Sequence, residues 1–185
     1  MTDPLRIYRK LAQATRLANA RLHRACAALG VAELTLKRTA FFGSIQKTLN
    51  HILMVDRFYL NALDGRPLNR AALDEATFCP DLSSLMSWQA ASDLALLAHV
   101  EGLSPEELEG IVAIDRGERV QHDRRDDVLS HMFQHQTHHR GQVHGMLSAS
   151  RVKPPQLDEF IVGDDSAVRA EDMTLLGWTE ADLMR

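Results

Sequence analysis

The sequence predicts an all-α protein, a four-helix bundle with a small β-hairpin and short additional helices. Four long segments repeat apolar residues at three- and four-residue steps, capping residues precede most of them, and one pair of β-prone runs interrupts them. The 185 residues, 45% of them hydrophobic, are expected to form one domain over 1–185, with a C-terminal extension over 151–185.

The first helix is expected over about 4–29. Asp3 and Pro4 form a pair typical of a helix start, because Asp caps the backbone amides and Pro suits the first helical position. Gly30 is a natural stop. Residues 31–43 lack a clean helical period, so we expect a connection there.

The second and third helices are expected over about 44–63 and 82–101. Ser44 and Asp81 are each placed to cap the N-terminus of one of them. The second helix is apolar over much of its circumference, which predicts deep packing. A loop over 67–80, bracketed by prolines, should join the two helices.

Ser104 begins a capping box, which predicts a short helix directly after it. Two β-prone runs flank Arg116 and Gly117 and predict a hairpin. A fourth long helix over about 124–150 should follow, opening at Asp123 or Asp126.

The fourth helix contains the stretch HMFQHQTHHRGQVH, which holds five of the nine histidines of the chain. At about 100° per residue, with His131 at zero, His135 lies at about 40° and His139 at about 80°. Apolar residues of the same helix share that arc. His138 lies at its edge, near −20°, and His144 lies well away, at about 220°.

His135 and His139 have the spacing of a metal-binding pair. Side chains four residues apart on a helix stand one turn above the other, so two imidazoles can converge on one ion with bonds of about 2.0–2.1 Å. Metalloproteases use the same spacing in HExxH, but Gln136 replaces the general-base glutamate of that motif. A protease is therefore disfavoured.

His51 is the best candidate for a third ligand. It lies in the apolar run LNHILMV and shares a helix face with Val55 and Phe58. A buried imidazole needs a polar partner, which a metal ion supplies. Three neutral nitrogens leave an open coordination position, as catalytic sites do. The simpler alternative is that these histidines only form hydrogen bonds.

Several other polar residues have less direct roles. Gln142 lies on the metal-facing arc and could support a ligand, and His131 could support one or form a pocket wall. Asp56 lies about 140° from His51, so we expect a hydrogen bond or salt bridge to a neighbouring helix rather than a general base. Arg140 should form a salt bridge or lie on a dimer surface.

The remaining reactive side chains are assigned no chemistry. His23 and His144 are expected to be solvated. Cys26 and Cys79 lack CxxC spacing and flanking bases, so both are interpreted as structural.

Two stretches together resemble the DinB family, within the wider DinB/YfiT-like superfamily. They are AFFGSIQKTLNHILMVDRFYLNALDG, with its single LNH histidine, and HMFQHQTHHRGQVHGMLSASRVKPPQLDEF, with HxxxHRGQ. The resemblance implies an up-down-down-up four-helix bundle that pairs into a homodimer. It also implies a divalent metal, zinc or nickel, bound by His51, His135 and His139.

The same resemblance implies two kinds of function. Some members are thiol S-transferases that use bacillithiol or mycothiol, and one group is a mycothiol-dependent isomerase. We therefore expect a divalent-metal-dependent enzyme, a thiol S-transferase or a hydrolase, acting on a small molecule with a low-molecular-weight thiol as a possible partner. The alternative is a non-catalytic metal- or ligand-binding dimer in a damage-inducible stress response.

The composition of the chain argues against nucleic acid and membranes as binding partners. A net charge of −4 and a pI near 6.1 give no basic surface for nucleic acid. No run of about 18 apolar residues occurs, so no membrane partner is expected. The charged N-terminal stretch MTDPLRIYRKL and the two cysteines favour a cytoplasmic location.

Overall fold

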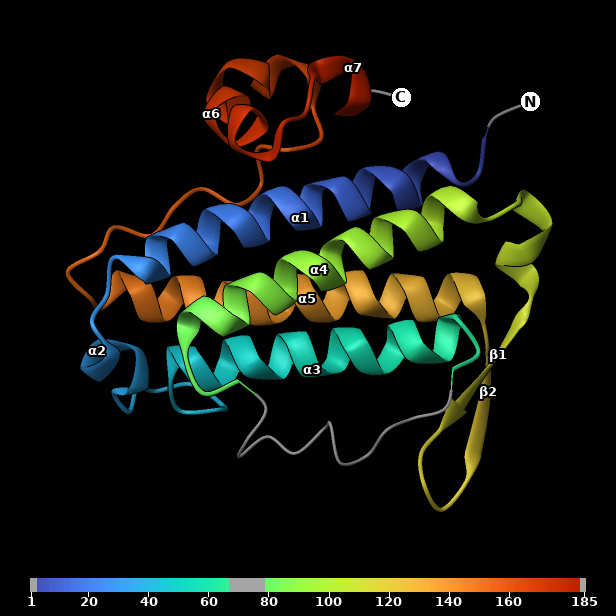
Figure 1. Ribbon diagram of the computed structural model, residues 1–185, viewed down its shortest axis with the longest axis horizontal. Coiled ribbons are helices and arrows are strands. Elements are labelled where there is room, and N and C mark those ends of the chain that lie inside the picture. The colour runs from blue at the N-terminus through green and yellow to red at the C-terminus, as the bar shows by residue number, and fades with distance from the viewer. Residues whose placement is uncertain (1–2, 67–78, 184–185) are drawn as a thin grey trace.

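Four long helices form the bundle in the structure, a computed structural model that describes residues 3–66 and 79–183. They are α1 (Arg6–Ala27), α3 (Ile45–Leu63), α4 (Leu82–Gly102) and α5 (Arg125–Ser148). Figure 1 shows α1 and α5 running one way and α3 and α4 the other, which is the up-down-down-up order. The predicted bundle is confirmed. Most of the loop expected over 67–80 lies outside the described residues.

Two of the predicted N-caps are confirmed. The Ser44 hydroxyl accepts the amide of Lys47 at 3.3 Å, and the Asp81 carboxylate accepts the amide of Ser84 at 2.8 Å. Both helices therefore begin where the sequence indicates.

The other two helix starts differ from the prediction. Leu5 rather than Asp3 is the cap position of α1, although the Asp3 carboxylate accepts the Leu5 amide at 2.9 Å. Neither Asp123 nor Asp126 caps α5, which follows Arg124 directly from the second strand. Asp126 instead lies in the first turn, where its negative charge suits the helix dipole.

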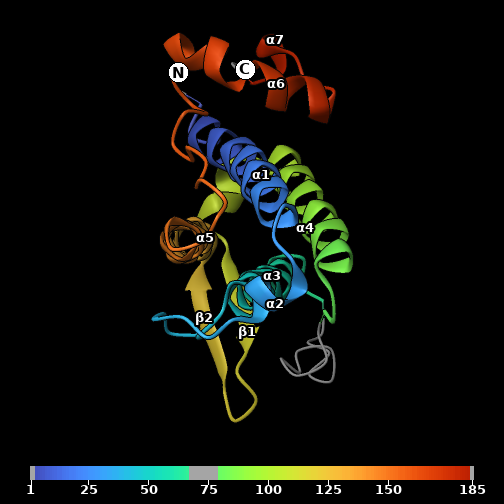
Figure 2. The same ribbon diagram turned by 90° about the vertical axis from the view of Figure 1, so that its left-hand side faces the viewer.

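The hairpin between α4 and α5 is confirmed as an antiparallel pair, β1 (Ile111–Asp115) and β2 (Val120–Arg124). It projects past α3 in both views (Figures 1 and 2). Gly117 in its turn has a φ of 94°, a left-handed conformation that favours glycine. The capping box at Ser104 precedes a 3₁₀ turn, η2 (Pro105–Glu109), rather than an α-helix.

Three short helices complete the fold. The expected connection over 31–43 contains a one-turn helix, α2 (Val31–Thr35), which the sequence did not predict. After the turn η3 (Gly163–Asp165), the C-terminal extension forms α6 (Ser166–Leu176) and α7 (Glu180–Leu183), stacked on the outer side of α1 (Figure 2). The buried Lys10 ammonium of α1 donates to the Leu183 carbonyl at 2.6 Å, which ties the extension to the bundle.

The bundle core has an apolar cluster at each end. The cluster near the hairpin includes Leu60, Leu96 and Leu129, and the cluster at the opposite end includes Leu49 and Leu147. Between them lies a buried polar layer to which each of the four long helices contributes: Asn19, Asp56, Gln89, Asp93, Gln136 and Arg140.

Hydrogen bonds join the members of this polar layer across the bundle. The Gln89 amide donates to Asp56 at 2.8 Å and to Asp93 at 2.9 Å, and the Asn19 amide donates to Asp93 at 2.9 Å. Arg140 donates to the Asn19 oxygen at 3.2 Å. The hydrogen bond expected for Asp56 is confirmed. The dimer-surface alternative for Arg140 is wrong, because its guanidinium is buried and hydrogen-bonded inside the chain. The charges of Asp93 and Asp56 attract it there, although no ion pair with either is found among the described residues.

Burial changes the ionisation of this layer. Removal from water raises the pKa of Asp56 to about 7 and that of Asp93 to about 6, against the opposing hydrogen bonds from Gln89. His23 is buried beside the layer, so its expected solvation is wrong. Burial, and then the Arg140 charge, lower the pKa of His23 to about 4.

We predict that Asp56→Asn removes a pH-dependent loss of stability. The folded-state pKa of Asp56 exceeds its unfolded value of 3.8, so its contribution is complete below about pH 4 and is lost as pH rises toward about 7. The wild-type free energy of unfolding should therefore fall relative to the variant over this range, by up to about 1.4 kcal/mol per pH unit. Urea unfolding at several pH values measures the difference, and a constant difference would contradict the assignment.

Candidate metal centre

Three histidines from two helices converge beside the polar layer. His51 of α3 and His135 and His139 of α5 each offer a ring nitrogen, and these nitrogens all lie within 4.8 Å of one another. The two helices pack directly against each other, so the residues come together without any loop. The sequence predicted this triad, and the structure brings it into a cluster that could bind a metal ion.

One distance within the cluster suits a shared cation. The Nε2 atoms of His51 and His135 face each other at 3.0 Å. Two imidazole nitrogens on one ion lie about 2.9–3.4 Å apart, for bonds of about 2.0–2.1 Å and angles between about 90° and 110°. A proton or a cation must lie between two such facing nitrogens, so this distance fits both a hydrogen bond between the two rings and a shared metal ion.

The protonation state of His135 also suits a ligand. Burial, and then the neighbouring His139 and His51, lower the pKa of His135 to about 3, so this imidazole is neutral at pH 7. Burial lowers the pKa of His139 as well, against the hydrogen bond that its Nδ1 donates to the Gln142 side-chain oxygen. Neutral imidazole is the form that binds metal ions.

Gln142 orients His139, as its place on the metal-facing arc suggested. The Nδ1 atom of His139 lies 3.0 Å from the Gln142 side-chain oxygen, which can only accept a hydrogen bond. The proton is therefore assigned to Nδ1, and Nε2 keeps its lone pair for a ligand bond. The Gln142 amide nitrogen lies 3.0 Å from Nε2 of His138, which stays outside the cluster.

Phe42 covers one side of the cluster and was not identified from the sequence. Its ring stacks on His51, with centroids 4.0 Å apart and planes at 29°, and lies 5.4 Å from the His139 ring. It belongs to the segment between α2 and α3, two residues before the Ser44 cap. The adjacent aromatic pair Phe41-Phe42 was the available signal, but an aromatic residue beside a cap is normally interpreted as packing.

A cavity of about 340 Å³ adjoins the cluster at His135. His131, expected as a support or a pocket wall, forms part of this wall, and its ring lies 6.1 Å from that of His135 and 5.1 Å from that of Tyr59. The lining residues are Met54, Val55, Phe58, Tyr59, Arg116, His131 and His135. The histidine cluster therefore borders a space large enough for a small organic molecule.

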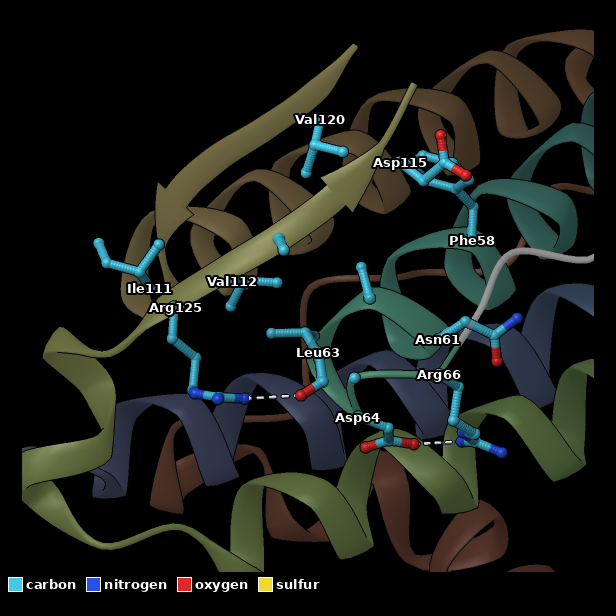
Figure 3. Close-up of a pocket in the computed structure, with 13 residues that line it drawn as sticks. Phe58, Asn61, Leu63, Asp64, Arg66, Ile111, Val112, Asp115, Val120 and Arg125 are labelled. Atoms are coloured by element: carbon cyan, nitrogen blue, oxygen red, sulfur yellow. Dashed lines mark hydrogen bonds and ion pairs between the residues drawn. The ribbon is translucent and has the colours of Figure 1, made fainter. Parts of the chain in front are cut away.

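A larger cavity of about 710 Å³ lies between the C-terminal end of α3 and the hairpin (Figure 3). No histidine or cysteine is among the described residues that line it. Its charged groups are engaged locally, since Arg66 pairs with Asp64 and Arg125 donates to the Leu63 carbonyl at 2.8 Å. It shares Phe58 with the smaller cavity but offers no set of metal ligands.

The two cysteines do not join the site. Both are buried and free, as expected for structural residues. Burial raises the pKa of Cys26 to about 12, and burial followed by the charge of Asp81 raises that of Cys79. Neither thiol is therefore a ready nucleophile.

Residues 1–166 match the DinB family, which is most of the chain. The chain belongs to the DinB family. This DinB domain spans all four long helices and the hairpin, whereas α6 and α7 lie at or beyond its end. No curated protein matches the chain. Among the described residues, no helix is long and apolar enough to cross a membrane.

We predict that His135→Ala abolishes metal binding by this DinB-family protein. Two remaining imidazoles would hold a divalent ion too weakly to survive gel filtration. Tag-free wild type incubated with Zn²⁺ should retain about one ion per chain by elemental analysis, as a single mononuclear site requires. Its melting temperature should rise with Zn²⁺, because the ion binds only the folded state.

His144→Ala is the matched control, since it removes a histidine of the same helix that lies outside the cluster. This variant should keep the wild-type zinc content. Equal zinc content in all three proteins would show that the cluster is not the binding site.

Proposed function

We propose that this DinB-family protein is a divalent-metal-dependent enzyme that transfers a low-molecular-weight thiol to a small electrophile. The observation that supports this most is the contact between the histidine cluster and a mainly apolar cavity through the shared residue His135. A divalent ion bound by His51, His135 and His139, zinc or nickel in this proposal, supplies Lewis acidity that lowers the pKa of a coordinated thiol or water.

The surrounding residues orient a ligand histidine, keep water away from the cluster and provide a cavity for the substrate. Gln142 keeps the Nδ1 proton on His139, and so presents the other nitrogen to the site. Phe42 stacks on His51 and shields that side of the cluster from solvent. On the other side, Met54, Val55 and Phe58 give the cavity apolar walls, which favour an organic substrate over bulk water.

The lining of the cavity favours thiol transfer over hydrolysis. A hydrolase gains from a carboxylate that accepts a proton from water, and no carboxylate is among the described residues that line the cavity. Asp56 is the nearest carboxylate in sequence to His51 on α3, but its hydrogen bond to Gln89 holds it in the polar layer. Thiol transfer would not need such a base, because a divalent ion held by the three histidines would lower the pKa of the thiol.

Hydrolysis remains the second candidate because of His131. Its imidazole lines the cavity beside the cluster and could accept a proton there. A non-catalytic metal- or ligand-binding stress-response dimer is the alternative outside enzymes. The proposal includes a homodimer, on the ground of the family resemblance, and a cytoplasmic location, on the ground of the sequence composition.

We predict that the zinc- or nickel-loaded protein conjugates a thiol to 1-chloro-2,4-dinitrobenzene faster than the metal-free protein. His135→Ala should reduce the rate to background, whereas His144→Ala should retain it. Absorbance of the thioether measures turnover, and release of nitrophenol from p-nitrophenyl acetate without thiol measures hydrolysis. Full metal binding without turnover in either assay would contradict the enzyme and favour the non-catalytic alternative.

A further inference from the structure

The cavity beside the histidine cluster has a cationic end at Arg116. This residue follows β1 in the hairpin turn, and its guanidinium lies over the rings of Phe58 and Tyr59, 5.0 and 5.5 Å from their centroids. It donates to the Tyr59 hydroxyl at 2.9 Å and to the Gln121 side-chain oxygen at 3.0 Å. An exposed arginine is thereby held in one orientation by α3 and β2.

Arg116 forms no ion pair within the described part of the chain, although it lines a hollow with Asp123 and Asp127. Its contacts among residues 3–66 and 79–183 are two neutral oxygens and two aromatic rings. A guanidinium has five N–H donors, of which two are used here. The remaining donors are available to an anion.

Arg116 and the histidine cluster open onto the same space. Both Arg116 and His135 line the 340 Å³ cavity, with His131 and Tyr59 between them. The other lining residues are Met54, Val55 and Phe58. A ligand that fits this lining has an anionic group at one end, an apolar body, and a reacting atom at the histidine end.

We propose that Arg116 binds the carboxylate of the small molecule that occupies this cavity, so that the substrate class is an organic acid with an apolar body. The inference deepens the proposed function, on which it rests, by naming Arg116 as the residue that determines specificity. A carboxylate fits better than a phosphate dianion, because the single charge of one guanidinium balances a monoanion but not a dianion. Arg116 also lines an adjoining hollow with Asp123 and Asp127, and the repulsion from these two carboxylates is greater for a dianion than for a monoanion.

The direct test is binding to the metal-free protein. 3-Phenylpropionate and its uncharged amide differ only in the anionic group, so their affinities isolate the contribution of Arg116. Wild type should bind the carboxylate about fivefold more tightly, the upper end for an ion pair at an exposed site. NMR titration measures both affinities, and the shifted resonances should include Phe58, Tyr59 and His131.

Arg116→Gln should remove the preference for the carboxylate, and Arg116→Lys should retain part of it, since it keeps the charge but loses the planar fork. Arg119→Gln is the matched control, because it removes the same charge from the same turn outside the cavity lining. It should keep the wild-type preference. Equal affinity of wild type for acid and amide, or the same loss in both glutamine variants, would overturn the proposal.

A kinetic comparison separates this inference from the proposed function. With metal-loaded protein, 3-mercaptopropionate should have a lower KM than its methyl ester, and Arg116→Gln should remove that difference while zinc content stays unchanged. Tighter binding of the carboxylate without any turnover would support Arg116 as an anion-binding residue and contradict the proposed enzyme. Turnover with equal KM for the acid and its ester, together with equal affinity for the acid and its amide, would support the enzyme and contradict the role of Arg116.

Discussion

The contact between α3 and α5 is the constraint on which the candidate site depends, because it sets Nε2 of His51 3.0 Å from Nε2 of His135. Neither helix can rotate or slide by one residue without separating these atoms, since one residue turns a helix by about 100°. The buried polar layer opposes such movement. Gln136 and Arg140 each follow a candidate ligand directly and lie in that layer, where Arg140 reaches Asn19 of α1.

The polar layer and the histidines occupy the middle of a core that would otherwise be apolar. Buried carboxylates and a buried guanidinium cost free energy unless they are hydrogen-bonded, and Gln89 and Asn19 supply those bonds. The apolar clusters at both ends of the bundle supply the hydrophobic stabilisation. The polar layer stabilises the centre of the bundle less than apolar packing would, but its hydrogen bonds fix the register between the two helices that carry the histidines.

Local sequence patterns were sufficient for the four helices, for the caps at Ser44 and Asp81, and for the pair His135 and His139, because each depends on spacing along a single helix. His51 was added because it lies on an apolar face of a second helix, which a bundle packs against the others. The role of Phe42 and that of Arg116 could not be predicted, since both reach the site from connecting segments whose path depends on tertiary packing. The burial of His23 was missed for a related reason. It faces the polar layer, and the partners that make a polar face buried lie on other helices.

X-ray absorption at the metal edge of zinc-loaded, tag-free protein tests the central claim most directly, because it counts imidazole ligands without reference to activity. The account predicts three nitrogen scatterers at about 2.0–2.1 Å with the multiple-scattering pattern of imidazole rings, together with at least one light ligand at the open position. A shell made mostly of oxygen or sulfur, or one that includes a single imidazole, would contradict a metal centre built by α3 and α5.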